Sequence, residues 1–201
     1  MIELYGGPRT RAFRCLWLLE EMGVDYAHNE TPPQSDALRA VYPNGKVPVL
    51  LEAGQIISDS TAILTYLSDK HNKFTFPAGT LDRARQDSLT QFLLDELDAC
   101  LWTAARHSFI LPQDIRVPAI KDSLKWEFAR AQKELVRRLG DGPFLMGEQM
   151  TIADIIATHC GTWAAAAKFD ISEPAYADYI ARMKAREGWQ AVARKAAKPK
   201  L

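Results

Sequence analysis

A short apolar stretch with a proline near its start, residues 44–51, constrains the fold of this chain more than any other segment. The apolar, partly β-branched run from Val47 to Leu51 is typical of a buried strand. Pro48 lacks a backbone N–H, so it belongs at the start of a strand or at a sheet edge. The bond between Val47 and Pro48 is also of the one kind that readily becomes cis. A cis bond would turn the Val47 N–H and C=O outward, where they could pair with an extended peptide ligand.

A second motif, Ser-Asp-Ser-Thr at residues 58–61, follows a turn and a return strand over residues 55–57 and opens a helix. The first backbone N–H groups of a helix have no partner within it, so they attract a carboxylate. The two motifs together predict a site with a strand edge for a peptide backbone and a helix start for a carboxylate. Two simpler interpretations remain open. Pro48 can be an ordinary trans proline at an edge strand, and Ser58 or Asp59 can serve only as the helix N-cap.

The order of the predicted elements around these motifs indicates a small mixed sheet. A strand over residues 2–5, a helix over residues 10–22 and a strand over residues 24–29 form one unit. A strand–helix–strand unit implies a parallel strand pair, and the later two-strand hairpin implies an antiparallel one. Residues 1–72 are therefore predicted to form a thioredoxin-like α/β domain with a four-stranded mixed sheet, in the order βαβ-ββα.

Strand signals vanish after this first domain. We expect a linker over residues 73–80 and an all-α helical domain over residues 81–201. Apolar residues recur near helical spacing in this part, notably from Leu81 to about Ser108. Further helices are expected over residues 119–139, 151–167, 174–184 and 189–195.

The composition argues against several classes of protein. Lysine plus arginine and aspartate plus glutamate number 25 each, so we expect neither nucleic acid nor a membrane as a partner. The three cysteines, Cys15, Cys100 and Cys160, are far apart, which argues against a disulfide framework and a zinc site. The sequence starts without a signal-peptide pattern and has no apolar run long enough for a membrane span. We therefore expect a cytoplasmic protein.

Four motifs, in this order along the chain, resemble those of cytosolic-type bacterial glutathione S-transferases over essentially its full length. Residues 4–21 resemble the family's first strand–helix unit, and residues 44–50 resemble its cis-proline loop. Residues 58–67 resemble its acidic-plus-serine motif, and residues 144–154 resemble the helix start of its C-terminal domain. The last motif includes a capping pattern that is expected to serve folding rather than chemistry. The resemblance implies a homodimer that uses glutathione as a co-substrate, with no permanently bound cofactor and no metal.

The resemblance also implies how glutathione would be held. The Val47 backbone, next to Pro48, would pair with the cysteinyl part of glutathione. Asp59 would take the γ-glutamyl ammonium, and Ser60 would take the γ-glutamyl carboxylate. Lys46 would reach the glycyl carboxylate, where the family often has a basic or polar residue.

The chain departs from the family at the catalytic position. Family members place Tyr, Ser or Cys near the end of the first strand or the start of the first helix, but residues 5–12 contain no cysteine. Thr10 stands where a serine is common and is our first candidate for the catalytic hydroxyl, and Tyr5 is the second. Arg9 and Arg11 are candidate helpers, Arg9 toward glutathione and Arg11 in catalysis. Simpler roles are an N-cap for Thr10, sheet packing for Tyr5 and a solvated face for the two arginines.

The second substrate is expected between the domains, along the helix that begins at Leu81. Five residues are candidates for this pocket: Phe92, Glu96, Trp102, His107 and Phe109. Most aromatic residues on such a helix belong to the core, and a lone histidine near a helix end is more often packed or solvated than catalytic.

The predicted function is that of a glutathione transferase, which joins the glutathione thiolate to a small apolar electrophile. Two alternatives remain open. One is a glutathione-dependent disulfide or peroxide reductase on the same fold. The other is a non-catalytic relative that serves as a binding or regulatory module.

Overall fold

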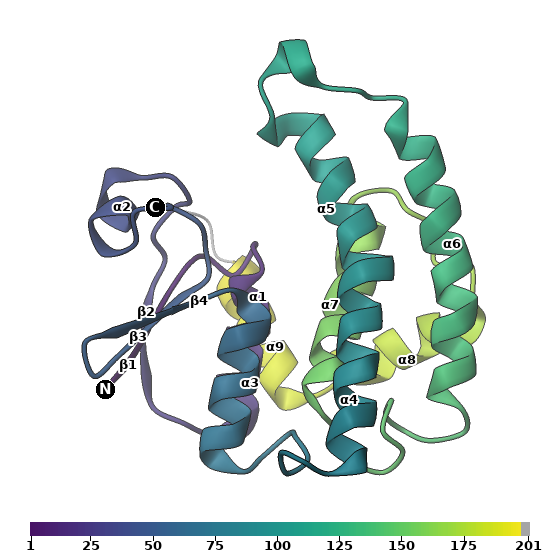
Figure 1. Cartoon of the computed structure of the whole chain (residues 1–201), viewed down its shortest axis with the longest axis horizontal. Coiled ribbons are helices and arrows are strands. Elements are labelled where there is room, and N and C mark those ends of the chain that lie inside the picture. The colour runs from purple at the N-terminus through teal and green to yellow at the C-terminus, as the bar shows by residue number, and fades with distance from the viewer. Residues whose placement is uncertain (198–201) are drawn as a thin grey trace. The chain divides into compact units, whose positions relative to one another are not determined.

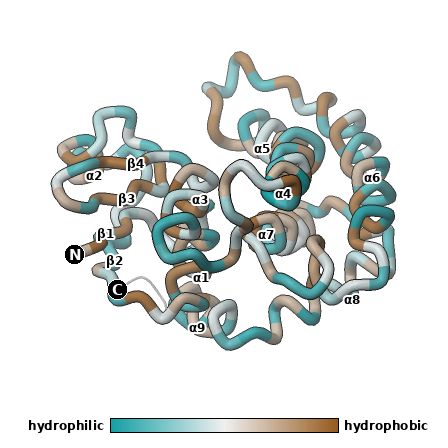
Figure 2. The backbone as a smooth tube through the Cα atoms, turned by 60° about the horizontal axis from the view of Figure 1, so that its bottom comes forward, coloured by the Kyte–Doolittle hydropathy of each residue, from teal (hydrophilic) through white to brown (hydrophobic). Residues whose placement is uncertain are grey.

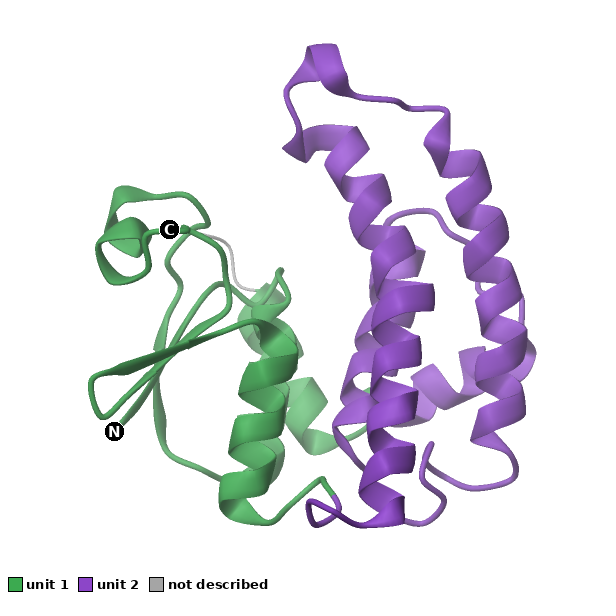
Figure 3. Ribbon diagram, in the orientation of Figure 1, with its two compact units in different colours: residues 1–75, 184–201 green, residues 76–183 purple. Residues whose placement is uncertain are grey.

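The computed structural model describes residues 1–197, which form two compact units (Figures 1 and 3). Of the described residues, the first unit contains 1–75 and 184–197, and the second contains 76–183. The expected division had placed everything after residue 80 in one helical domain. The structure differs because its last helix packs on the thioredoxin-like part of the chain.

A four-stranded mixed sheet forms the centre of the first unit. Its strands are β1 (Ile2–Tyr5), β2 (Tyr26–Asn29), β3 (Val49–Glu52) and β4 (Gln55–Ser58). Their spatial order is β2-β1-β3-β4, with β1 parallel to β2 and the other pairs antiparallel. This confirms the predicted thioredoxin-like arrangement, although β2 begins two residues later than expected. Hydrophobic residues colour parts of β3 and β4 brown in Figure 2.

Helices flank this sheet. They are α1 (Ala12–Met22), α2 (Asp36–Val41), α3 (Ser60–His71) and α9 (Glu187–Ala197). Residues 14–19 of α1 are buried without a break, because α1 contacts both β1 and α9. Gly23 ends α1 in the left-handed conformation, at a φ of 66°, where glycine carries no steric penalty. These contacts fix the segment before α1, which carries the predicted catalytic residues.

The second unit is all α. A long helical run consists of α4 (Leu81–Phe92), a π-helical segment (Leu93–Asp98), α5 (Ala99–Ala105) and a second π-helical segment (Arg106–Ile110). A short 3-10 turn (Gln113–Ile115), α6 (Ile120–Leu139), α7 (Ile152–Ala166) and α8 (Pro174–Lys184) follow. The predicted helices are thus present, and α9 is longer than expected. Within residues 1–197, no helix has the length and apolar character that crossing a membrane requires.

A buried carboxylate organises the start of α7. Asp154 is fully buried and accepts hydrogen bonds from the backbone N–H groups of Leu145, at 2.8 Å, and Thr151, at 2.7 Å. The Tyr179 hydroxyl of α8 donates to the same carboxylate at 2.7 Å. Thr151 and Asp154 form the predicted capping box. Asp154 therefore joins α7, α8 and the loop before α7 inside the helical unit.

Candidate functional site

The cis-proline loop lies at the end of the β1–β3 ladder. The Val47–Pro48 peptide bond is cis, as predicted. The ladder ends at the pair Tyr5–Val49, so the Val47 backbone lies beyond it. Gly6 makes room for this loop: it has a φ of 124°, and a Cβ there would lie 2.9 Å from the Val47 Cβ. Glycine is therefore required where the first turn approaches the loop.

Asp59 marks the start of α3 and has an unusual backbone conformation. Its φ is 76° and its ψ is 129°, a region that residues other than glycine seldom occupy. Its Oδ1 atom accepts from the N–H groups of Thr61, at 2.8 Å, and Ala62, at 3.3 Å. The N-cap interpretation of Asp59 is thus confirmed. Strained residues of this kind cluster at functional sites, so the conformation also fits a binding role.

A buried arginine lies next to the start of α3. Ser60 is only 2% exposed, and its hydroxyl accepts a hydrogen bond of 3.4 Å from Nη1 of Arg14, which is fully buried. The Cys15 thiol is also buried, lies 3.7 Å from the Ser60 carbonyl oxygen and has a pKa that burial raises. Cys15 is therefore a core residue. Arg14 thus brings a positive charge to the start of α3. Arg14 was not among the site residues predicted from the sequence, where the only indication was its position within an apolar helix.

Tyr42 is a second residue that the sequence did not point to. Its hydroxyl lies 3.0 Å from the Ser58 hydroxyl, and this hydrogen bond, with help from Asn44 and the Lys46 charge, lowers the pKa of Tyr42. The bond ties the segment that carries Lys46 to the end of β4, directly before Asp59.

The two candidate catalytic hydroxyls have different surroundings. The Thr10 hydroxyl donates to the Gly7 carbonyl at 2.8 Å and accepts from the Ala12 N–H at 3.1 Å, at the start of α1. The Tyr5 hydroxyl donates to Glu3 Oε2 at 3.0 Å. Burial, together with the Glu3 carboxylate, raises the pKa of Tyr5. Thr10 is thus at the positive end of a helix, and Tyr5 is next to a negative charge.

The three basic residues of the predicted site, Arg9, Arg11 and Lys46, have different surroundings. Arg9 donates from Nε and Nη2 to the Ala196 carbonyl, at 3.2 and 3.0 Å. Lys46 is exposed, and Arg11 is half-buried in the residue directly before α1. The guanidinium of Arg9 is thus engaged by the end of α9, a partner that the sequence did not suggest.

The five residues predicted for the second-substrate pocket all lie in the second unit. Phe92 lies under the Arg138 guanidinium, at 4.3 Å from ring centre to Cζ, and Glu96 accepts from Arg130 at 2.8 Å. His107 accepts from the Val117 N–H at 3.0 Å, which fits its expected packed role. The remaining two differ in exposure: Trp102 is half-buried and Phe109 is 67% exposed.

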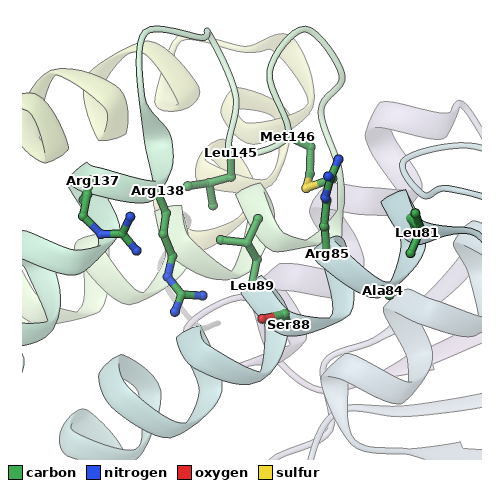
Figure 4. Close-up of a pocket in the computed structure, with 9 residues that line it drawn as sticks. All are labelled: Leu81, Ala84, Arg85, Ser88, Leu89, Arg137, Arg138, Leu145 and Met146. Atoms are coloured by element: carbon green, nitrogen blue, oxygen red, sulfur yellow. The ribbon is translucent and has the colours of Figure 1, made fainter.

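A shallow groove of about 740 Å³ lies elsewhere on the helical unit (Figure 4). Its apolar side chains come from α4 and from the loop before α7, and include Leu89, Leu145 and Met146. Arg85 and Arg138 lie along it (Figure 4). None of the five second-substrate candidates lines this groove.

Comparison with known proteins agrees with these features. Residues 4–75 match the family model of the glutathione S-transferase N-terminal domain. A hematopoietic prostaglandin D synthase of Gallus gallus is 27% identical over 172 residues, which cover 84% of this chain and 81% of that protein. A disulfide-bond oxidoreductase of Escherichia coli (strain K12) is 28% identical over 176 residues, or 81% of this chain and 79% of that protein. A solved glutathione transferase from Methylococcus capsulatus aligns over 98% of both chains, with a TM-score of 0.84 and 26% identity.

The protein combines a thioredoxin-like unit, which carries the cis-proline loop, with an all-α unit. Residues 4–75 belong to the family of glutathione S-transferase N-terminal domains, and the chain has the fold of a solved glutathione transferase over 98% of its length. The similar proteins are named for different reactions, so similarity alone does not assign a reaction to this chain.

Proposed function

We propose that this chain is a glutathione transferase, in which bound glutathione supplies a thiolate that attacks a small apolar electrophile. The observation that carries the proposal is a pair of features in the first unit. One is the Val47 backbone beyond the β1–β3 ladder, and the other is the start of α3 at Asp59 and Ser60. Glutathione offers a peptide backbone to the first and a carboxylate with an ammonium group to the second.

Each part of glutathione has a proposed partner. The Val47 backbone, preceding Pro48, pairs with the cysteinyl residue in the manner of an added strand. The N–H groups at the start of α3 and the Ser60 hydroxyl hold the γ-glutamyl carboxylate, which the buried Arg14 charge also attracts. Asp59 holds the ammonium: Oδ1 caps the helix, and Oδ2 has no hydrogen-bond partner among residues 1–197.

The exposed Lys46 completes the proposed site at the glycyl carboxylate. The chemistry then requires a thiolate, because the sulfur attacks the electrophilic carbon while the leaving group departs with the bonding electrons. A free thiol has a pKa of about 8.5, so little of it is ionised at neutral pH. A hydroxyl donor near the start of α1 would lower that pKa.

We favour Thr10 over Tyr5 for this role. The Tyr5 proton is donated to Glu3, and a carboxylate close to a thiolate would raise the thiol pKa instead of lowering it. Thr10 lies at the N-terminal end of α1, where the helix dipole favours negative charge. Arg11, in the same segment, adds a positive charge.

The Thr10→Ala substitution tests this assignment. Contact with the thiolate would replace the Thr10–Gly7 hydrogen bond, so a gain of about 1.5–3 kcal/mol is offset by about 0.5–1.5 kcal/mol. The difference corresponds to roughly one pKa unit. In Thr10→Ala, the apparent pKa in kcat/KM should therefore rise by about one unit, with a loss of activity that grows as the pH falls. Tyr5→Phe should leave the profile in place, and the reverse pattern would make Tyr5 the catalytic hydroxyl.

We propose that the electrophile contacts the helical unit through Phe109, which is 67% exposed, whereas the other four candidates are half-buried. Phe92, Glu96 and His107 each have a partner inside that unit, which favours structural roles for them. Exposed apolar residues also lie on the connection between α5 and α6, which supports an apolar second substrate: Phe109, Ile110, Ile115 and Val117.

A glutathione-dependent disulfide or peroxide reductase is the second candidate function. It is favoured by the similarity to the disulfide-bond oxidoreductase of Escherichia coli. A panel of an aryl halide, a hydroperoxide and a mixed disulfide, each assayed with glutathione, separates the two. Turnover of the aryl halide alone supports the transferase, whereas turnover of only the other two supports the reductase. Retention on a glutathione column without any turnover would indicate a binding or regulatory module.

We also propose that the protein acts in the cytoplasm as a homodimer, as the family resemblance implies. Light scattering at micromolar concentration should give a mass of twice the 22.5 kDa chain. A monomer at that concentration would contradict the proposed dimer. It would not contradict the proposed glutathione site, which is tested separately.

A further inference from the structure

The C-terminal helix α9 belongs to the first unit, which is green in Figure 3, and packs along α1. Ion pairs hold it at both ends. Just before its start, the Arg186 guanidinium donates two hydrogen bonds to the Glu21 carboxylate, at 2.9 and 2.8 Å. Near its end, the Lys195 ammonium donates to Glu20 Oε1 at 2.7 Å and to the Tyr26 hydroxyl at 2.8 Å. Two separate ion pairs therefore join α9 to α1.

The last turn of α9 also holds the segment that leads into α1. The two hydrogen bonds of Arg9 to the Ala196 carbonyl are made there. Carbonyl groups in the last turn of a helix have no partner within the helix and carry partial negative charge, so a guanidinium suits them. Lys195 directly precedes Ala196, and its bonds to Glu20 and Tyr26 therefore fix the carbonyl that Arg9 contacts.

Arg9 lies next to Thr10 inside a tight turn. The Thr10 N–H donates to the Gly7 carbonyl at 3.1 Å, and the Thr10 hydroxyl donates to the same oxygen at 2.8 Å. The backbone hydrogen bond closes the turn even when the hydroxyl turns to the thiolate, so a displacement of Arg9 is passed on to Thr10. The position of the Thr10 hydroxyl thus depends on Ala196, which is 187 residues from Arg9 in the sequence.

We propose that the end of α9 sets the geometry of this turn, with Arg9 and Lys195 as positioning residues for the thiolate-stabilising hydroxyl. The proposal rests on the proposed function, because it takes Thr10 as the residue that contacts the glutathione thiolate. Arg9 is exposed, so without the Ala196 carbonyl its side chain and the turn would sample more conformations. Catalysis is sensitive to such freedom, since a misplacement of about 1 Å can cost roughly a hundredfold in rate.

A purely structural role for α9 makes a different prediction. If its bonds only hold the helix against α1, the pair Arg186–Glu21 should matter as much as the pair Lys195–Glu20. Neither pair should then affect the pKa of bound glutathione. Arg186→Met is the matched control, because it breaks an ion pair between α9 and α1 away from the turn.

The experiment compares Arg9→Met, Lys195→Met and Arg186→Met with the wild-type protein. Two quantities are measured: amide hydrogen exchange over residues 7–12, and the pH dependence of kcat/KM with glutathione and an aryl halide. We expect the first two variants to speed exchange in the turn, to lower kcat/KM about tenfold and to raise the apparent thiol pKa. Arg186→Met should lower only the melting temperature.

The double variant Arg9→Met/Lys195→Met should lose no more activity than the less active of the two single variants, because both residues act through one carbonyl. Exchange in the turn that matches the wild type in Arg9→Met and Lys195→Met overturns the proposal. An equal effect of Arg186→Met overturns it as well. A wild-type protein that binds no glutathione would instead contradict the proposed function, and the exchange data would still decide whether α9 holds the turn.

Discussion

The Asp154→Ala variant is expected to lose at least about 3 kcal/mol of its free energy of unfolding. The substitution removes the acceptor of four buried donors: the N–H groups of Leu145 and Thr151 and the hydroxyls of Thr151 and Tyr179. Each buried donor left without a partner costs about 1–3 kcal/mol. Chemical denaturation followed by circular dichroism measures the loss.

Two further variants sharpen this test. Asp154→Asn keeps the shape but places an amide NH₂ where only acceptors fit, so it should fall between wild type and Asp154→Ala. Asp141→Ala, at an exposed position in the same unit, should change the free energy of unfolding by less than about 0.5 kcal/mol. A stability of Asp154→Ala close to that of the wild type would show that the capping carboxylate does not hold α7 and α8 together.

The second large effect is expected on glutathione affinity when the Asp59 carboxylate is removed. A hydrogen bond to a charged group contributes about 1.5–3 kcal/mol, so Asp59→Ala should weaken binding by roughly tenfold to a hundredfold. The same change removes the N-cap of α3 and should cost about 1 kcal/mol or more of stability, because alanine cannot accept from Thr61 and Ala62.

Asp59→Asn separates these two roles. Asparagine is a good N-cap and tolerates a positive φ, so the variant should keep its stability. It lacks the negative charge, so its affinity for glutathione should fall about as far as that of Asp59→Ala. Calorimetric titration of both folded variants gives the comparison. Wild-type affinity in Asp59→Asn would mean that this carboxylate does not hold the γ-glutamyl ammonium.

The local patterns of the first unit carried most of the information about its fold. A proline before an apolar strand predicted the cis-proline loop, and a polar segment after a return strand predicted the start of α3. The structure contains both. The helix start also predicted its own cap, because Asp59 bonds to backbone groups only two and three residues away.

Contacts between distant parts of the chain could not be predicted in the same way. Arg14 bonds to Ser60 across 46 residues and Arg9 to Ala196 across 187 residues, and neither pair leaves a pattern in one sequence. The two π-helical segments of the long run were also missed, since a turn widened by one residue disturbs the apolar spacing only slightly. The place of α9 in the first unit was not predicted either, because it depends on contacts between α9 and α1, which are far apart in the sequence.

The most direct test of the central claim is a calorimetric titration of the wild-type protein with reduced glutathione. The proposed site at Val47, Asp59 and Ser60 predicts saturable binding with one molecule of glutathione per chain. Binding should be lost when the γ-glutamyl group is absent, as in the dipeptide cysteinylglycine, because that group meets the start of α3. If glutathione gives no saturable binding up to millimolar concentration, or if the dipeptide binds equally well, the proposed glutathione site is wrong.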